Sequence, residues 1–479
     1  MSSGSGGAVL AVDLGTGSVK AVAFSAEGLE VLGRASVPVA VSAPRAGWAE
    51  ASPEEWQRAA DAAVDECLGR CGRPRIAGVG LSGQMHGVVL CREDGAPLRP
   101  AVLWADTRSR EEAERLRESP AELRRRLANP LVAGMAGPSL AWLVRKEPAG
   151  VEEAAWALQP KDWLRAALTG EVATEPSDAS ATLLWDVPAD RWCDDAFALL
   201  GIPRRLAPAV RRSADVAGRV RQRAGCSIQP GTPVVHGGAD TACALFGTAT
   251  LPRGTIQISV GTGAQVVAAV ESPQVDPSGT THLFRSVMPN SWYAMGAVQN
   301  AGLAFERAWR WLGIGWEEAY RLAEEAPPGS AGLTFLPHLS GERTPYVDST
   351  LRGGWLGLGL EHTRAHLVRA VLEGVAFAVR QAVDALREAG HPAAEARLVG
   401  GGSRHPSWQR MLADVLRLPL AVVAQPDASS QGAARLAAMG IGMPAQTPSP
   451  AVGMVIEPGS DFRYEEAFAR FRARAPLRG

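Results

Sequence analysis

Apolar residues near the start of the chain form two short runs separated by a glycine-rich turn. The run at 8–12 and the run at 18–24 flank Gly15-Thr16-Gly17. Short apolar runs bounded by turn residues are typical of buried β-strands. Residues 256–270 repeat this order around Gly261-Thr262-Gly263, 246 residues further along. The pattern therefore predicts two β-hairpins of the same design, one in each half of the chain.

After each hairpin, strand patterns alternate with amphipathic helix patterns. A capping box at Ser52 predicts a helix to about residue 69, and the apolar run 76–80 predicts a buried strand. In the second half, apolar residues recur with helical spacing over 366–388, and a strand is expected at 396–399. Alternation of this kind is typical of α/β sheets flanked by helices.

The repeat distance, close to half the chain, indicates two related domains, because solenoid repeats recur every ~20–50 residues. The length of 479 residues accommodates two or three domains. The boundary is expected near residues 243–250, before the second hairpin, which gives domains at 8–245 and 246–475. A third glycine-rich strand end lies at 400–403, and a short helix is expected at 464–474.

Charge and composition limit the partners. The chain has 49 basic and 50 acidic residues, so no overall field attracts nucleic acid or an anionic membrane. No apolar stretch reaches the ~20 residues of a membrane helix. Residues 1–7 are expected to be a flexible leader without a signal peptide, and the six cysteines form no CxxC pair. These features predict a reduced, cytoplasmic protein that binds small molecules.

The lysines are few, since only Lys20, Lys146 and Lys161 occur. Phosphate binding would therefore depend on backbone N–H groups, a metal and arginine. A glycine turn leaves backbone N–H groups free, and successive free N–H groups form an anion site. Neither turn fits a Walker loop or a dinucleotide fingerprint. We expect the two turns to bind phosphate from opposite sides; the alternative is two plain hairpin turns.

Two aspartates follow buried strands at positions suited to chemistry. Asp13 precedes the first glycine turn, where a carboxylate beside phosphate needs a cation, so it is a candidate Mg²⁺ site; an Asx turn is the alternative. Asp240 follows Gly237-Gly238-Ala239 and precedes a predicted helix at 241–246. It is a candidate catalytic group because the glycines allow close approach of a ligand, and its alternative role is a helix N-cap.

Two further stretches are candidates for holding a polyol. Met85 and His86 lie after the predicted strand of the first half, and Trp104 and Asp106 follow soon after. Methionine in such a place is usually core, and histidine is usually a loop residue. A tryptophan with an aspartate two residues on is also a common arrangement for binding a sugar.

Taken together, these stretches resemble the FGGY family of carbohydrate kinases, and within it the xylulokinase branch. The resemblance covers nearly the whole chain. The second family signature fits residues 353–373, and 138–147 resembles the first signature with Ser139 in place of the usual lysine. The phrases GLSGQMHG (80–87), LPHLSGERTP (336–345) and VGGGS (399–403) are also close to the xylulokinase forms.

The resemblance implies two actin-like, ribonuclease-H-like ATPase domains around a central cleft, with ATP as co-substrate and Mg²⁺ as cofactor. It implies a sugar bound to the first lobe, Asp240 as the catalytic base and Asp13 as the metal-linked aspartate. The residues implied to bind sugar are Met85, His86, Trp104, Asp106 and Thr241. Those implied to bind nucleotide are Thr16, Gly17, Gly261, Thr262, Gly302, Gly401 and Gly402.

The implied reaction is phosphorylation of D-xylulose to D-xylulose 5-phosphate in pentose catabolism. Thr241 stands where the branch usually has asparagine, and Pro406 stands where several relatives have a polar residue near adenine. Thr241 leaves kinases of another ketose such as ribulose, of a polyol, or of an aldonate such as gluconate as alternatives, and Pro406 leaves the nucleotide preference open. A non-sugar actin-like ATPase and a regulator without catalysis are alternatives of other classes. A homodimer is left open.

Overall fold

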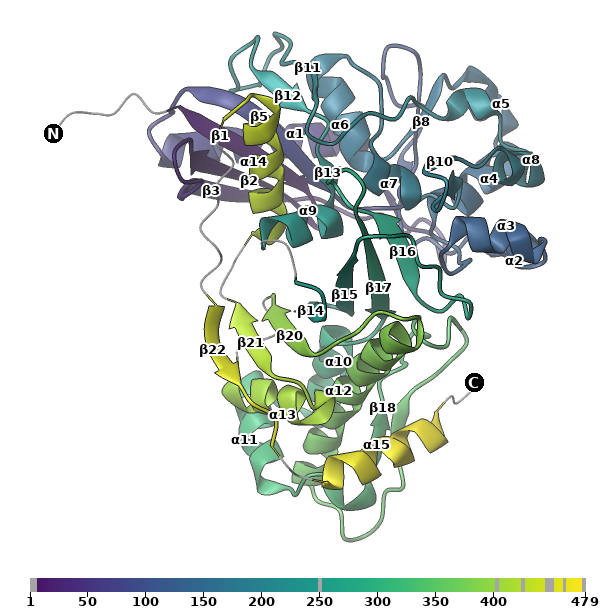
Figure 1. Cartoon of the computed structure of the whole chain (residues 1–479), viewed down its shortest axis with the longest axis vertical. Helices are drawn as coiled ribbons and strands as arrows, with labels where there is room; N and C mark the ends of the chain where they lie inside the picture. Colours follow the sequence, from purple (N-terminus) through teal and green to yellow (C-terminus); the bar gives the residue numbers. More distant parts are fainter. Residues whose placement is uncertain are drawn as a thin grey trace, which may run out of the picture.

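The computed structural model describes residues 7–248, 252–400, 405–423, 427–443, 452–459 and 462–475. Two seven-stranded sheets organise these residues. In Figure 1 the first sheet lies in the upper lobe and the second in the lower lobe, with helices around each. The expected α/β class with two sheet domains is confirmed.

The first sheet carries the first hairpin at its centre. Its strand order is β11 (Val216–Arg219), β12 (Pro233–Val235), β5 (Ile76–Gly83), β1 (Ala8–Leu14), β2 (Ser18–Ser25) and β3 (Val31–Pro38), with β13 (Gly238–Ala239) also paired to β5. β1 runs antiparallel to β2 and parallel to β5. The carboxyl ends of β1, β5 and β13 therefore lie side by side, because these parallel strands end at one edge.

The second sheet repeats this connectivity. Its order is β16 (His282–Arg285), β17 (Trp292–Val298), β15 (Ala264–Val270), β14 (Thr255–Val260), β20 (Glu395–Val399), β21 (Leu420–Val423) and β22 (Val452–Ile456). β14 is antiparallel to β15 and parallel to β20, as β1 is to β2 and β5. The repeat of glycine turns in the sequence is thus a repeat of the whole sheet design.

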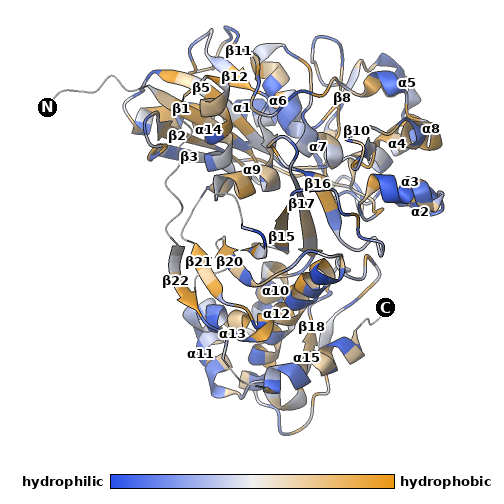
Figure 2. Cartoon of the chain, viewed as in Figure 1, coloured by the Kyte–Doolittle hydropathy of each residue, from blue (hydrophilic) through white to orange (hydrophobic). Residues whose placement is uncertain are grey.

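The two long helices expected from the sequence cover these sheets. Helix α1 (Pro53–Arg70) begins at Ser52, whose Oγ accepts a hydrogen bond from the Glu55 N–H at 3.2 Å. Helix α12 (Arg364–Glu388) packs on β15, β17 and β18 (Thr334–Leu336) and buries most of its residues. Figure 2 shows both sheets as mainly hydrophobic and the outlying helices α2 and α3 as strongly hydrophilic.

The remaining elements connect or flank these units. The helices are α2 (Arg110–Arg117), α3 (Ala121–Leu127), α4 (Ala136–Lys146), α5 (Pro148–Glu153), α6 (Pro160–Thr169), α7 (Pro176–Ser180), α8 (Asp194–Leu200), α10 (Gly302–Leu312), α11 (Trp316–Glu325), α13 (Pro406–Leu416) and α15 (Arg463–Arg474). The short strands are β4 (Glu50–Ala51), β6 (Val89–Cys91), β7 (Ala101–Val102), β8 (Trp156–Leu158), β9 (Trp185–Asp186), β10 (Arg191–Trp192) and β19 (Gly354–Leu356). Among the described residues, no helix is both long and apolar enough to cross a bilayer.

One helix of the second half belongs spatially to the first lobe. Helix α14 (Ala428–Gly440) packs against α9 (Asp240–Gly247) and lies on β1 and β5, as Figure 1 also shows. Glycines allow this close approach, because a Cβ at Gly432 would lie 1.9 Å from the Cys243 carbonyl oxygen. The predicted division at 245/246 therefore falls inside α9, and the two lobes share elements across it.

Candidate active site

The two glycine turns leave some backbone N–H groups without a backbone partner among the described residues. In the first, the Gly15 N–H donates to the Ser18 carbonyl at 3.0 Å; in the second, the Gly261 N–H donates to the Gly263 carbonyl at 2.8 Å. Within the described ranges, the backbone N–H groups of Thr16 and Thr262 donate to no backbone carbonyl. Each turn can therefore offer N–H groups to an anion.

Helix α10 braces the second turn. The Gly302 N–H donates to the Gly261 carbonyl at 2.9 Å, and the Leu303 N–H donates to the Thr262 carbonyl at 3.0 Å. A Cβ at Gly302 would lie 2.4 Å from the Gly261 oxygen, so only glycine fits there. The Gly302 N–H is therefore used within the protein, where it holds the turn in place, and the expected contact of Gly302 with nucleotide stays a prediction.

Other glycines of the turns face open space. A Cβ at Gly17 would meet no atom within 4 Å, and one at Gly261 would meet only the Gly263 oxygen, at 3.9 Å. These are the positions at which a ligand can approach the backbone closely. Gly401 and Gly402, also expected to contact nucleotide, lie outside the described residues.

The Thr16 side chain joins the first turn to the expected sugar side. Its Oγ1 accepts a hydrogen bond from Trp104 Nε1 at 2.9 Å and donates to Gln84 Oε1 at 3.1 Å. The hydroxyl is therefore engaged within the protein, and the backbone N–H of Thr16 is the group left for a phosphate. Half-buried Trp104 is placed directly beside the turn by this contact.

Asp240 is the first residue of α9, and its carboxylate does not cap that helix. The N-cap position belongs to Ala239, which makes no side-chain cap. Asp240 Oδ1 accepts hydrogen bonds from the Thr241 N–H at 2.5 Å and from Thr241 Oγ1 at 3.1 Å. Among the described residues nothing donates to Oδ2, which is free for a ligand. The alternative of a conventional N-cap is therefore excluded.

The environment of Asp240 suits a catalytic base, and that of Asp13 suits a ligand to a cation. Burial, with a contribution from the Asp13 charge, raises the pKa of Asp240 to about 6. Burial also raises the pKa of Asp13, which lies opposite Ser82 in the parallel pair of β1 and β5. Asp13 Oδ1 is buried without a hydrogen-bond partner in the described part of the chain. An unpartnered buried carboxylate oxygen fits a site completed by a cation.

The raised pKa of Asp240 predicts an acid limit on activity. A base must be deprotonated, so kcat/KM for the sugar should rise with pH through about 6 and level off above it. The measurement is a pH profile of kcat/KM between pH 4.5 and 8.5, with the acid limb falling tenfold per pH unit. A profile flat down to pH 4.5 would contradict the assignment.

Met85 and His86 lie at the end of β5, next to side chains from the second sheet. The Tyr293 hydroxyl of β17 donates to Met85 Sδ at 3.8 Å, and the His86 ring lies 5.9 Å from Phe284 of β16. His86 has a left-handed backbone with φ of 69°, uncommon outside glycine and frequent at functional sites. This pair therefore lies where the two lobes meet.

His86 is poised as a neutral hydrogen-bond acceptor. Its Nδ1 lies 2.7 Å from the Ala181 carbonyl, which can only accept, so Nδ1 carries the proton. Burial lowers the pKa of His86 to about 4, so the ring is uncharged at neutral pH. Nε2 is left to accept a hydrogen bond, for example from a sugar hydroxyl.

Asp106 is held by hydrogen bonds within the protein, and its expected contact with sugar stays a prediction. Its carboxylate is fully buried and accepts hydrogen bonds from the Ala49 N–H at 2.6 Å and from the Arg108 guanidinium at 2.7 Å. Arg108 also bonds to Glu50 at 2.7 Å and stacks over Trp48. With its oxygens used in this way, Asp106 holds the loop that carries Trp104.

The second lobe contributes residues that the sequence pattern did not single out. Tyr293, Phe284 and Gln265 come from β17, β16 and β15, and Arg343 lies with its guanidinium carbon 5.5 Å from the Trp104 ring centre. Gln265 Oε1 accepts from Thr241 Oγ1 at 3.4 Å. Of these four residues, only Arg343 belongs to a sequence segment that the family resemblance had pointed out, the segment 336–345.

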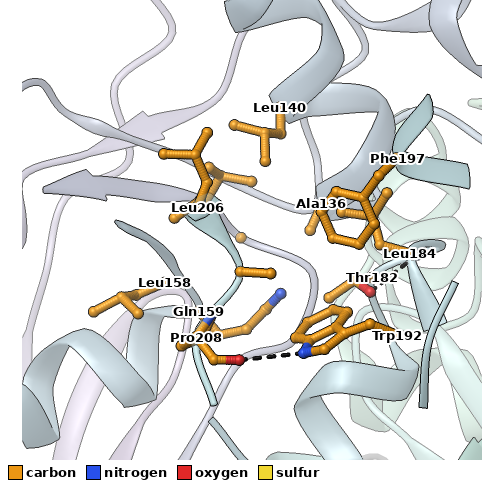
Figure 3. A pocket seen from close by; sticks show the side chains of 14 residues that line it. Ala136, Leu140, Leu158, Gln159, Thr182, Leu184, Trp192, Phe197, Leu206 and Pro208 are labelled. Atoms are coloured by element: carbon orange, nitrogen blue, oxygen red, sulfur yellow. Dashed lines mark hydrogen bonds between the residues drawn. The ribbon is translucent and has the colours of Figure 1, made fainter. Parts of the chain in front are cut away.

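A separate apolar pocket lies between residues of β8, α4 and α8 (Figure 3). Its walls include Gly87, Thr182 and Trp192, and Trp192 Nε1 donates to the Pro208 carbonyl at 3.2 Å. None of the expected catalytic or nucleotide-binding residues lines this pocket, so it is distinct from the candidate active site.

The matches to known sequences define the class of this protein. The pattern of the N-terminal domain of the FGGY family of carbohydrate kinases matches residues 8–247, and that of the C-terminal domain matches 256–441. The chain belongs to the FGGY family of carbohydrate kinases, and it is an ATP-dependent sugar kinase.

Within this family, the chain is similar to several xylulose kinases. The chain is 34% identical to the xylulose kinase of Klebsiella pneumoniae over 89% of each chain, and 32% identical to that of Bacillus subtilis over 91% of this chain and 88% of that one. A structure described as a xyloylose kinase from Brucella ovis superposes with a TM-score of 0.91 at 35% identity over 98% of both chains. The two-domain, actin-like ATPase fold is thereby confirmed.

Proposed function

We propose that this kinase transfers the γ-phosphoryl group of ATP to the terminal hydroxyl of D-xylulose, giving D-xylulose 5-phosphate for pentose catabolism. The observation that carries the proposal is the free Oδ2 of Asp240, in a carboxylate whose pKa burial raises to about 6. The xylulose kinase names of relatives over about nine-tenths of the chain support the choice of sugar.

Asp240 orients the terminal hydroxyl and takes its proton as the bond to phosphorus forms. Phosphoryl transfer has a loose transition state, so positioning and charge stabilisation provide most of the catalysis. The N–H groups of Thr16 and Thr262 bind phosphate oxygens from the two lobes. Met85 packs on the sugar carbons, His86 Nε2 accepts a hydroxyl hydrogen bond, and Trp104 closes the side next to the first turn.

The residues present fit Mg²⁺ held mainly by the nucleotide. Asp13 offers an unpartnered carboxylate oxygen, and the described residues contain no group of three metal-ligating side chains. Mg²⁺ is commonly held by one or two carboxylates, waters and substrate phosphates, which matches a single Asp13. When bound, it would neutralise phosphate charge; Asp13 itself would hold it on the first lobe.

A substrate panel tests this proposal. ADP release is measured with D-xylulose, D-ribulose, D-gluconate, xylitol and glycerol, with a no-sugar blank. We expect the highest kcat/KM for D-xylulose. Equal ADP release with and without sugars would favour an actin-like ATPase, and a preference for gluconate or a polyol would keep the family and overturn the substrate.

Substitution of Thr241 tests more sharply which sugar the enzyme prefers. Its hydroxyl is committed to Asp240 and Gln265, so it leaves room where relatives carry a longer asparagine amide. Thr241→Asn adds one donor beside the base, and it should raise the preference for D-xylulose over D-ribulose by about fivefold, the effect of one hydrogen bond. Thr241→Val, which has the same shape without a donor, is the control. An unchanged preference in Thr241→Asn would contradict this placement of the sugar.

The cellular location of the enzyme follows from the same proposal. We place it in the cytoplasm, where ATP and free sugars are available and where thiols stay reduced. Light scattering of the purified chain tests whether it forms the homodimer that the sequence left open.

A further inference from the structure

Arg343 lies on a segment that is anchored on both sides of it. The Glu342 carboxylate accepts hydrogen bonds from the Gln299 N–H at 2.6 Å and from the Arg343 N–H at 2.9 Å. Thr344 Oγ1 accepts from the Ala297 N–H at 3.0 Å. These bonds fix the backbone of Arg343 against the end of β17, so its side chain is carried by a rigid part of the second lobe.

From this anchor the Arg343 side chain reaches across to the first lobe. Its guanidinium carbon lies 5.5 Å from the ring centre of Trp104, within cation–π range. Trp104 in turn donates to Thr16 of the first turn. Arg343 is therefore a group of the second lobe that faces the expected sugar side of the first.

The Arg343 guanidinium has no ion-pair partner among the described residues, and the charge of neighbouring Glu342 acts on it only from beyond ion-pair distance. The guanidinium is half-buried, and within the described ranges it forms no ion pair and no side-chain hydrogen bond. Arg108, by contrast, pairs with both Asp106 and Glu50. Burial lowers the pKa of Arg343, although the group stays protonated. A partly desolvated cation without an anion is costly, which favours a ligand as its partner.

The surroundings of Arg343 place it away from the reacting end of the sugar. Its charge contributes to the lowered pKa of both His86 and His282, whose rings each lie within 6 Å of Phe284. The pKa of Asp240 is raised instead by burial and by Asp13. Arg343 thus belongs to the His86 end of the site, and Asp240 belongs to the end where phosphorus is attacked.

The chemistry of these groups defines the oxygen they bind. Arginine has five N–H donors and no acceptor, whereas neutral His86 offers an acceptor at Nε2. We propose that Arg343 is a specificity-determining residue, which binds an acceptor oxygen at the end of the sugar opposite the phosphorylated hydroxyl. That oxygen is the carbonyl of a ketose, and a carboxylate at the same end is bound as well. The inference rests on the proposed sugar kinase function and deepens it.

Two variants and a matched control test this role. Arg343→Gln removes the charge, and Arg343→Lys keeps the charge but lacks the planar guanidinium group. Arg310→Gln changes an exposed arginine of α10 that has no place in the proposed site. For Arg343→Gln we expect kcat/KM for D-xylulose to fall about 10 to 100-fold, mainly through KM, as for loss of one charge-assisted hydrogen bond. KM for ATP should change less than twofold, and Arg343→Lys should lose less than Arg343→Gln.

Calorimetry with D-xylonate tests the charge without requiring turnover. The wild-type chain should bind D-xylonate at least tenfold more tightly than xylitol, which lacks the anionic end, and Arg343→Gln should abolish that difference. Equal D-xylonate binding in both proteins, or a loss confined to KM for ATP, would overturn the inference. If the wild-type chain phosphorylates no sugar, the proposed function fails, and the calorimetric comparison still decides the role of Arg343.

Discussion

Replacing Asp240 by asparagine should lower kcat for D-xylulose phosphorylation by about 10² to 10⁴-fold, the range for removal of a general base. Asparagine keeps the shape of the side chain, and its Oδ1 can still accept from the Thr241 N–H as aspartate does. It cannot accept a proton, so the loss should fall on kcat while KM for the sugar changes little.

The control for this variant is Asp194→Asn. Asp194 is also the first residue of a helix, α8, and it is exposed and paired with Arg204 on the surface. The Asp194→Asn variant should have a kcat and a melting temperature close to those of the wild type. If Asp240→Asn turns over D-xylulose within a few-fold of the wild-type rate, Asp240 is not the base.

Replacing Gly261 by valine should weaken ATP binding by about 10 to 100-fold. The backbone tolerates the change, because a Cβ at Gly261 meets only the Gly263 oxygen, at 3.9 Å. The valine side chain instead occupies the space through which phosphate reaches the Thr262 N–H. Loss of one charge-assisted hydrogen bond costs about 1.5–3 kcal/mol, which gives the expected range.

Calorimetry with an ATP analogue and with D-xylulose measures the two affinities separately. D-Xylulose binding should change less than twofold, because a Cβ at Gly261 meets none of the residues expected to bind the sugar. Gly315→Val is the control, since a Cβ at Gly315 meets no atom within 4 Å and the position has extended backbone. Equal losses of affinity for both ligands would contradict the division of binding between lobes.

The sequence predicted the fold well because its strongest signals are local. The hairpins around Gly15-Thr16-Gly17 and Gly261-Thr262-Gly263 need apolar strands and small turn residues, and both needs are visible in the amino-acid order. Helix α12 was also visible, because one apolar face repeats over its whole length. The crossing of α14 onto the first sheet was not predicted, because it depends on glycine contacts between distant segments.

The site was predicted less completely, since its contacts join segments far apart in the chain. The position of Asp240 after two glycines could be read from the sequence, but whether its carboxylate caps α9 depends on the backbone at Ala239. The sequence also did not predict that the Asp106 carboxylate accepts hydrogen bonds from Arg108. For Arg343 the sequence offered only its place in the 336–345 segment, because its contact with Trp104 depends on the folded chain.

The most direct test of the central claim is the identity of the phosphorylated product. The wild-type chain is incubated with Mg²⁺, ATP and D-xylulose, and the reaction is followed by ³¹P NMR. We expect ADP and one sugar monophosphate in equal amounts, with the phosphorus coupled to the two hydrogens on the terminal carbon. ADP accompanied by inorganic phosphate alone would contradict the account, because the chain would then hydrolyse ATP without phosphorylating a sugar.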